Sequence, residues 1–251
     1  MSEVKNLFVE QEEAKRYHQF RPIYHNLMTE KLNDFFKTHI KNTLDVACGT
    51  GHSTNALAQI STNIIGCDVS EAMLMEARKY SNIQFIQSPA EKLPFADSTF
   101  DYLNISMAYQ WLRQDQFLKE AKRVLNAKGF LGIDNYGFSG NMSGHEQFLE
   151  RYKAFDRQYM QFAPRNKNYP DDSDLKIEGF FLVKELTYQH EVHMNKSQFI
   201  NYLMTRSNFL ELSKENRDHV ETLLNDYYES DFNNTEKHLK FHGTVRLYSL
   251  D

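Results

Sequence analysis

The sequence predicts an α/β fold, in which a doubly wound, mostly parallel sheet of seven strands is covered by helices on both faces. Three observations predict it. Short apolar runs alternate with amphipathic runs from residue 43 to residue 135, as in right-handed βαβ units. The first apolar run leads directly into Gly49 and Gly51, as a strand does where its sheet meets a nucleotide-like ligand. Two later apolar runs extend the same sheet.

The helices and strands are expected in the following order. Two helices precede the sheet, at Glu10–Phe20 and Tyr24–Ile40, and Pro22 separates them because proline cannot continue a helix. Five strands follow, at Thr43–Ala47, Asn63–Cys67, Ile83–Gln87, Phe100–Ile105 and Phe130–Asn135. The helices between them are expected at Ser53–Ile60, Glu71–Tyr80 (with Ser70 as N-cap) and Gln114–Leu125, where the apolar residues recur at helical spacing. The last two strands, Val183–Met194 and Leu239–Leu250, are separated by helices near Lys196–Met204 and Ser213–Tyr228.

These elements are expected to form a single domain of 251 residues with four parts. The parts are an N-terminal helical lid (1–40), a cofactor-binding core (41–136), a cap insertion (137–182) and the C-terminal part of the sheet (183–251). In the cap, Tyr152, Phe155, Tyr159 and Phe162 share one face of a helix. This face is expected either to pack in the core or to line a substrate pocket over the ligand edge of the sheet.

Composition and charge exclude some classes of partner. The formal net charge is -5, which argues against nucleic acid or an anionic membrane as the main partner. The polar N-terminal segment resembles no signal peptide, and no apolar run is long enough to span a bilayer. A cytoplasmic location is therefore expected, with no membrane partner. The sequence leaves the oligomeric state open.

The cysteines and histidines indicate a reducing compartment and no metal site. Cys48 and Cys67 are expected to be two buried thiols in a reducing compartment. The ten histidines include no spacing typical of a metal site, so no metal is predicted.

The glycine loop and a later acid indicate an adenosyl ligand. Gly49 and Gly51 allow the backbone to approach a ligand closely. Asp68 ends the second strand about 20 residues later, where a carboxylate accepts hydrogen bonds from a ribose diol. Stabilisation of the following helix is the plainer explanation of Asp68, but the glycines favour the ribose.

Asp45 decides between two such ligands. A carboxylate four residues before Gly49 would repel a pyrophosphate and attract a cation. S-Adenosylmethionine carries an ammonium, a sulfonium and a ribose diol but no phosphate, so Asp45 favours it over a dinucleotide. The other interpretation is a structural acid that holds the glycine loop, and both roles are compatible.

Four motifs together resemble the class I S-adenosylmethionine-dependent methyltransferases. They are "LDVACGTGHST", "GCDVSEAMLMEAR", "SPAEKLPFADSTFDYL" and "EAKRVLNAKGFLGI". The chain is most similar to the small-molecule branch with ubiquinone/menaquinone-type and trans-aconitate-type enzymes, whose fold is Rossmann-like. "YHQFRPIY" also resembles a segment of the trans-aconitate-type members. Beyond residue 137 the resemblance is weak.

The resemblance implies the cofactor site. Its residues would be Asp45, Ala47, Gly49 and Gly51 at the methionine end, Asp68 at the ribose, Val69 and Met73 beside the adenine, Ala90 and Glu91 at the adenine edge, and Ser106 below the reactive sulfur. Many relatives carry an aspartate where this chain has Pro89. Backbone atoms or Ser88 would then replace that contact with the adenine amino group.

The candidate residues for the methyl acceptor are Tyr17, His18, Arg21, Tyr109 and Trp111. In the related branch the N-terminal segment folds over the cofactor. His18 is either a base or an exposed histidine. Arg21 holds a carboxylate, of the cofactor or of the acceptor, or else makes a surface ion pair. Tyr109 and Trp111 either line the pocket or pack beneath it, and "YLMTRSNF", residues 202–209, resembles a segment near the pocket in trans-aconitate-type enzymes.

The expected function is S-adenosylmethionine-dependent methyl transfer to an O, N or C atom of a small molecule, with a carboxylate as one candidate. No catalytic residue is assigned, because a sulfonium methyl is already activated and a base is needed only where the nucleophile must lose a proton. Two alternatives stay open: a non-catalytic S-adenosylmethionine-binding protein and an NAD(P)-dependent oxidoreductase.

Overall fold

The computed structural model describes residues 8–159, 172–233 and 235–250. Its seven-stranded sheet has the order β3-β2-β1-β4-β5-β7-β6. The strands are β1 (Ile40–Val46), β2 (Ser61–Asp68), β3 (Gln84–Gln87), β4 (Phe100–Ser106), β5 (Leu125–Met142), β6 (Phe180–Met194) and β7 (Lys237–Leu250). The first five strands pair in parallel, and β7 runs antiparallel to both β5 and β6. The predicted α/β class and mostly parallel sheet are confirmed.

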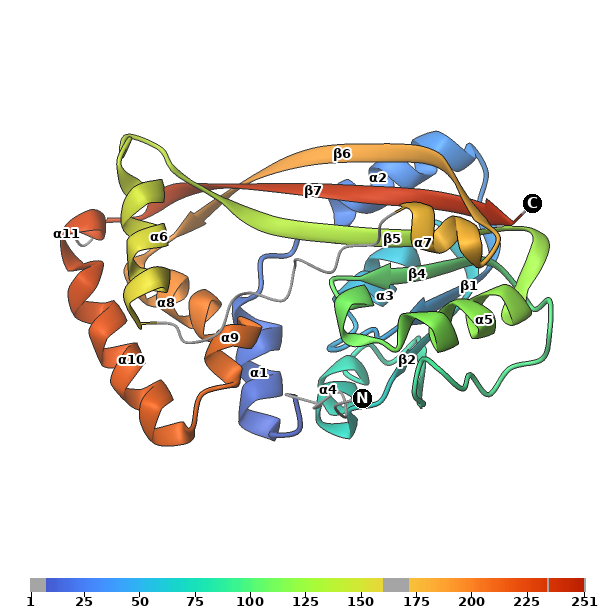
Figure 1. Ribbon diagram of the computed structural model, residues 1–251, viewed down its shortest axis with the longest axis horizontal. Coiled ribbons are helices and arrows are strands. Elements are labelled where there is room, and N and C mark those ends of the chain that lie inside the picture. The colour runs from blue at the N-terminus through green and yellow to red at the C-terminus, as the bar shows by residue number, and fades with distance from the viewer. Residues whose placement is uncertain (1–7, 160–171, 234, 251) are drawn as a thin grey trace.

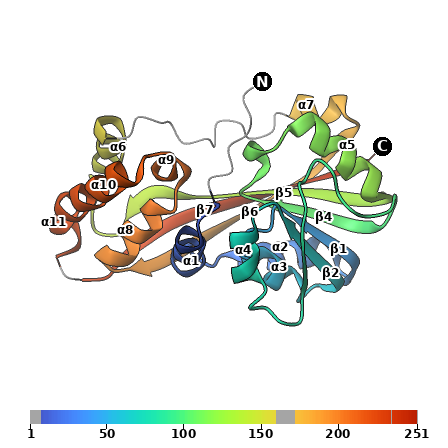
Figure 2. The ribbon, with the colours of Figure 1, turned by 90° about the horizontal axis from the view of Figure 1, so that it is seen from below.

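Helices cover both faces of the parallel half (Figure 2). On one face α5 (Gln114–Val124) packs through Phe117, Leu118, Ala121 and Val124 against the apolar residues of β1, β4 and β5. On the other face, α2 (His25–Phe36) and α3 (His52–Leu57) bury Met28, Leu32 and Leu57. The central strands are therefore apolar on both sides, as a parallel sheet requires.

The antiparallel strands extend far beyond the parallel half. Figure 1 shows β5, β6 and β7 running to a second group of helices, α6 (Phe148–Tyr159), α8 (Lys196–Met204), α9 (Ser207–Leu210), α10 (Lys214–Tyr227) and α11 (Glu229–Phe232). Phe148, Phe199, Tyr228 and Phe232 form an aromatic core there. Helix α1 (Gln11–Phe20) lies between the groups and contacts both α8 and α4 (Glu71–Ala77). Two packed bodies thus share one sheet.

Several boundaries differ from the sequence predictions. Strand β5 continues to Met142, because its residues pair with β7 as far as Leu239, so residues 137–142 begin no cap. Helix α2 ends at Phe36, where Lys37 takes a left-handed φ of 61°. Ile40 belongs to β1, where it pairs with Ser61. The prediction of helix through Ile40 was wrong.

The range predicted as a cap separates into distant parts. Helix α6 belongs to the far helical group, whereas α7 (Asp172–Ile177) lies beside the parallel half. There Leu175 is buried among the residues of α5, and the Tyr248 hydroxyl donates to Asp172 Oδ1 at 2.9 Å. Phe162, part of the predicted aromatic face, lies outside the described residues. The N-cap prediction is confirmed, because Ser70 Oγ accepts from the Met73 backbone N–H at 3.2 Å.

Cys48 and Cys67 are both free and buried, as predicted. Over the described ranges, the structure contains no helix with the length and apolar character that crossing a bilayer requires.

Candidate active site

A cavity of about 1160 Å³ lies at the carboxyl ends of the parallel strands. This is the edge at which open α/β sheets bind ligands. Loops after β1, β2, β3 and β4 supply one wall, and α1, β5, α6 and the α8–α9 segment supply the other. Its lining includes the predicted cofactor residues Ala47, Gly49, Asp68, Val69, Met73, Ala90, Glu91 and Ser106.

Asp68 joins the two loops that would hold a ribose. Its Oδ2 accepts from the backbone N–H of Gly49 at 2.8 Å, and its Oδ1 accepts from the N–H of Ser70 at 2.8 Å. Burial raises the pKa of Asp68, while these backbone hydrogen bonds oppose the rise. Each carboxylate oxygen has a second lone pair to accept from a ligand hydroxyl. The carboxylate is thus fixed at the cavity wall with acceptor capacity to spare.

The backbone turns sharply where the two central strands reach the cavity. Ala47 after β1 and Met107 after β4 have φ values of 52° and 57°, although both carry a Cβ. Gly49 and Gly51 follow with φ values of 55° and 80°. Left-handed backbone at non-glycine residues costs roughly 1–2 kcal/mol each and gathers at functional sites. Both Ala47 and Met107 line the cavity.

Asp45 lies behind this loop. Its side chain is 0% exposed and does not line the cavity. Oδ2 accepts from the hydroxyls of Ser53 and Thr54 at 2.6 and 2.7 Å, and Oδ1 accepts from the Asn104 amide at 2.7 Å. Burial raises the pKa of this carboxyl, and the three hydrogen bonds oppose the rise. These contacts match the interpretation of Asp45 as an acid that holds the glycine loop. Its attraction for a cationic ligand stays a prediction.

The loop after β3 is closed by its own hydrogen bonds. Ser88 Oγ donates to the carbonyls of Pro89 and Lys92 at 3.2 and 3.0 Å, so this hydroxyl is engaged within the loop. Glu91 Oε1 accepts from the Arg113 backbone N–H at 2.9 Å. Contacts to an adenine edge are therefore left mainly to the backbone and to Glu91.

A buried carboxylate lies directly behind Ser106. Asp134 is 2% exposed, and its Oδ2 accepts from Ser106 Oγ at 2.6 Å and from Tyr24 Oη at 2.8 Å. Its Oδ1 accepts from Tyr188 Oη at 2.8 Å. Burial raises the pKa of Asp134 to about 6, despite these three donors. No sequence pattern indicates this cluster, because its members lie on four separate segments of the chain.

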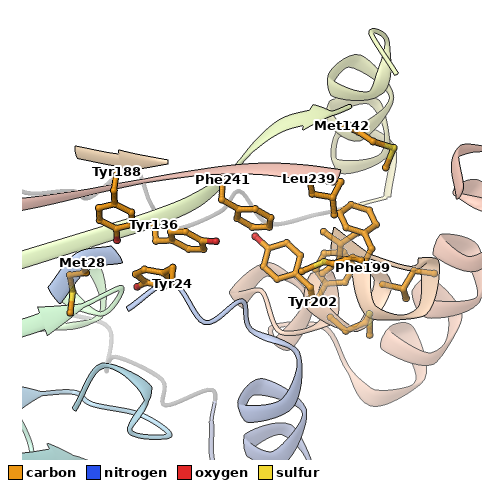
Figure 3. Close-up of a cluster of buried hydrophobic side chains, with 14 of the residues drawn as sticks. Tyr24, Met28, Tyr136, Met142, Tyr188, Phe199, Tyr202, Leu239 and Phe241 are labelled. Carbon is orange, nitrogen blue, oxygen red and sulfur yellow. The ribbon is translucent and has the colours of Figure 1, made fainter. Parts of the chain in front are cut away.

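Aromatic rings and a guanidinium form the wall opposite the glycine loop. The Arg21 guanidinium lies 4.8 Å from the centre of the Tyr17 ring and 5.6 Å from that of Tyr202, and Nη2 donates to the Thr205 carbonyl at 3.0 Å. Nearby, the ring of Tyr136 stacks at 3.7 Å on that of Tyr24, and Figure 3 shows the Tyr202 hydroxyl pointing toward this stack. Within the described part of the chain, Arg21 has no carboxylate partner, and its Nε is buried without a hydrogen bond.

The structure brings together most of the residues predicted for the acceptor. Tyr17, Arg21 and Trp111 line the cavity, whereas His18 and Tyr109 do not. His18 stacks on His52 at 4.4 Å, and burial lowers its pKa. Tyr109 is buried against Phe117.

Gly51 also lies behind the lining and opens α3. Sequence reasoning singled out no residue of the β5 continuation, and the α8–α9 segment was noted only by its likeness. From these come the further lining residues Tyr136, Phe138, Arg206 and Asn208.

Comparisons with known proteins agree with this geometry. Residues 44–133 match a family model described as a methyltransferase domain. A Dictyostelium discoideum protein, named provisionally as a methyltransferase, is 27% identical over 192 residues, which cover 75% of this chain and 71% of that protein. The ubiquinone/menaquinone biosynthesis C-methyltransferase of Rickettsia prowazekii is 37% identical over 102 residues, covering 35% of this chain and 41% of the relative.

A solved structure from Anaeromyxobacter dehalogenans, described provisionally as a type II methyltransferase, matches with a TM-score of 0.66 at 18% identity. The match covers 92% of this chain and 98% of that one. At this identity the likeness concerns the fold. The chain spans less than half the length of the Rickettsia relative.

Proposed function

Residues 44–133 form a class I S-adenosylmethionine-dependent methyltransferase domain, and on that premise we propose that the protein methylates a small acceptor whose carboxylate is held by Arg21. The cofactor follows from the family. The acceptor is inferred from the wall of the cavity that faces the cofactor loops.

The residues at the cavity edge fit this cofactor. Asp68 offers a buried carboxylate with free lone pairs for the ribose diol, and Val69 and Met73 offer apolar surface beside it for the adenine. When bound, S-adenosylmethionine supplies a methyl group that is already activated by a positive sulfur. The protein then has to orient the acceptor and exclude water.

The proposal rests on Arg21, whose guanidinium has no carboxylate partner among the described residues. Its guanidinium borders the cavity, and among the described residues it has a single backbone carbonyl as acceptor and no partner for its Nε. Arg16, on α1 five residues earlier in the chain, pairs with Glu221 instead. A half-buried guanidinium without a counter-charge is costly, and a ligand carboxylate satisfies it in the bidentate geometry that arginine favours.

A carboxylate acceptor also agrees with the absence of an assigned base. It is ionised at neutral pH, so its oxygen attacks without losing a proton. The new O–C bond forms to the methyl carbon while the S–C bond breaks, and the electron pair stays on sulfur. The products are a methyl ester and S-adenosylhomocysteine. Arg21 would hold both carboxylate oxygens, and one of them attacks through a lone pair that the guanidinium does not engage.

The test compares Arg21→Met with Arg16→Met. Binding of S-adenosylhomocysteine is measured by calorimetry, and transfer of labelled methyl from S-adenosylmethionine is measured over a panel of small carboxylic acids and their neutral analogues. We expect Arg21→Met to keep its affinity for S-adenosylhomocysteine and to lose at least about tenfold in kcat/KM toward acids. Arg16→Met should change neither. A large loss of S-adenosylhomocysteine affinity in Arg21→Met would instead assign Arg21 to the cofactor's own carboxylate, against the proposal.

Two further expectations belong with this proposal. The free, buried thiols of Cys48 and Cys67 support a reducing compartment, and hence a cytoplasmic location. The formal net charge of -5 supports a small molecule over nucleic acid as the partner.

A further inference from the structure

Asn208 carries a buried side-chain amide at the cavity. It is the second residue of α9, is 1% exposed and lines the cavity. Among the described residues, neither its Nδ2 nor its Oδ1 has a hydrogen-bond partner. Buried polar side chains in folded proteins almost always make hydrogen bonds, and each exception needs an explanation. Because Asn208 lines the cavity, a ligand bound there is the partner that the site provides for.

The charges around Asn208 are already balanced. Arg206, two residues earlier, also lines the cavity, but both of its terminal nitrogens donate to Asp156, at 3.2 and 2.9 Å. Its guanidinium also lies 5.3 Å from the centre of the Tyr152 ring. An arginine so paired adds little net positive charge to this end of the cavity. A second carboxylate placed here would approach Asp156 and be repelled by it.

The amide itself selects a neutral group. A primary amide presents a donor and an acceptor side by side. A hydroxyl or an amide on the ligand can satisfy both atoms. A carboxylate only accepts, so it would pair with Nδ2 and leave Oδ1 facing another oxygen.

Asn208 and Arg21 are close enough to bind one small molecule. Arg21 donates to the carbonyl of Thr205, which lies three residues before Asn208. Even a fully extended chain would place the Cα atoms of Thr205 and Asn208 within roughly 11 Å of each other. The ring of Tyr202 lies beneath Arg21 and continues the same wall. One face of the cavity thus carries a positive group at one point and a neutral donor–acceptor pair at another.

We propose that the methyl acceptor is a monocarboxylate that also carries a hydroxyl or amide group, which Asn208 recognises while Arg21 holds the carboxylate. This inference rests on the proposed function, since it assumes an acid at Arg21. Asn208 is a specificity-determining residue in this scheme. It takes no part in bond making.

The experiment uses the full chain with labelled S-adenosylmethionine and a matched series of straight-chain acids of graded length. Each skeleton is tested as the unsubstituted acid, the terminal hydroxy acid, the terminal amide and the dicarboxylate. The unaltered protein should methylate the hydroxy acid or amide at least about tenfold better in kcat/KM than the unsubstituted acid and the dicarboxylate. Asn208→Leu, which keeps the volume and removes the amide, should abolish that preference. Asn201→Leu is the control, because the Asn201 amide donates to its own helix at Ser197.

The outcomes separate the two proposals. If the unaltered protein prefers the unsubstituted acid or the dicarboxylate, the role of Asn208 is overturned while carboxylate methylation stands. If it binds S-adenosylhomocysteine but methylates none of the acids, the proposed function fails, and this inference fails with it. The selectivity of the unaltered protein decides the matter even if Asn208→Leu does not fold.

Discussion

The hydroxyl of Tyr24 donates a 2.8 Å hydrogen bond to Oδ2 of Asp134, 110 residues further along the chain. Tyr24 caps the start of α2, and its ring stacks on Tyr136 of β5 (Figure 3). The bond therefore ties the N-terminal segment, which carries Tyr17 and Arg21, to the centre of the sheet. The position of the cavity wall that carries Tyr17 and Arg21 therefore depends on this hydrogen bond.

Tyr24→Phe should destabilise the protein by about 1–3 kcal/mol, because it keeps the stacked ring but removes one of the donors to a buried carboxylate. Urea unfolding followed by circular dichroism measures the change. Tyr159→Phe is the control, since its hydroxyl interacts with the neighbouring exposed Gln158, and it should stay within about 0.5 kcal/mol of the unaltered protein. Equal effects of both substitutions would show that the Tyr24–Asp134 bond contributes little.

The stability of the protein should carry the signature of Asp134 in its pH dependence. Burial raises the pKa of this carboxyl from 3.8 to about 6, so the folded protein holds the proton more tightly than the unfolded chain does. The stability that Asp134 contributes by binding this proton is present in full below pH 3.8 and is lost as the pH rises through 6. The difference between the folded and unfolded pKa values corresponds to about 3 kcal/mol of stability.

Asp134→Asn removes this titration. We expect the free energy of unfolding of the unaltered protein, relative to the variant, to fall by on the order of 3 kcal/mol between pH 3.8 and pH 7. Asp45 and Asp68 are common to both proteins, so their own titrations cancel in the difference except for the electrostatic coupling between Asp45 and Asp134. A difference that is flat over this range would mean that Asp134 titrates normally in the fold.

Asp68→Ala should weaken the binding of S-adenosylhomocysteine by about a hundredfold or more, because two hydrogen bonds from a ribose diol to a charged acceptor are lost. Calorimetric titration gives the affinity. Asp34→Ala removes an exposed acid that pairs with Lys37 and should leave the affinity unchanged. An unaltered affinity in Asp68→Ala would remove the ribose assignment.

Asp45→Asn separates the two interpretations of this acid. If Asp45 only holds the loop, the substitution should lower the free energy of unfolding by about 1–3 kcal/mol. The folded protein should then keep its affinity for S-adenosylhomocysteine. An acid that attracts a cationic ligand should also lose affinity, most strongly for S-adenosylmethionine at low salt, because salt screens the attraction. The hydrogen bonds from Ser53, Thr54 and Asn104 favour the first result.

Gly243→Ala should be strongly destabilising. A Cβ at Gly243 would lie 2.0 Å from Cζ of Tyr188, whose hydroxyl donates to Asp134. The ring would have to move, at a cost of roughly 1–3 kcal/mol for overpacking. Gly137→Ala on the adjacent strand meets nothing within 4 Å and serves as the stability control. Comparable melting temperatures for the two variants would contradict the close packing of Tyr188 on Gly243.

Local patterns were enough to predict the parallel half of the molecule. The alternation of apolar and amphipathic runs depends on neighbouring residues, and it placed β1 to β4 and α3 to α5 within a few residues of their ends. The glycine loop and Asp68 were located in the same way. Local residue types indicate both a left-handed backbone and the end of a strand. The lengths of β5 and α2 were misjudged because their ends depend on pairing with distant strands.

By itself, the sequence determined the order of the elements, the type of sheet and the edge at which a cofactor would bind. Only the tertiary structure decided what faces that edge. Asp134 meets Tyr24, Ser106 and Tyr188, and Arg21 meets the α8–α9 segment, through the register of β5 to β7 and the packing of α1. Such contacts join residues tens to hundreds of positions apart, and no short-range pattern encodes them. Even Asp45 follows this rule, because the amide that binds its Oδ1 comes from Asn104 on the neighbouring strand.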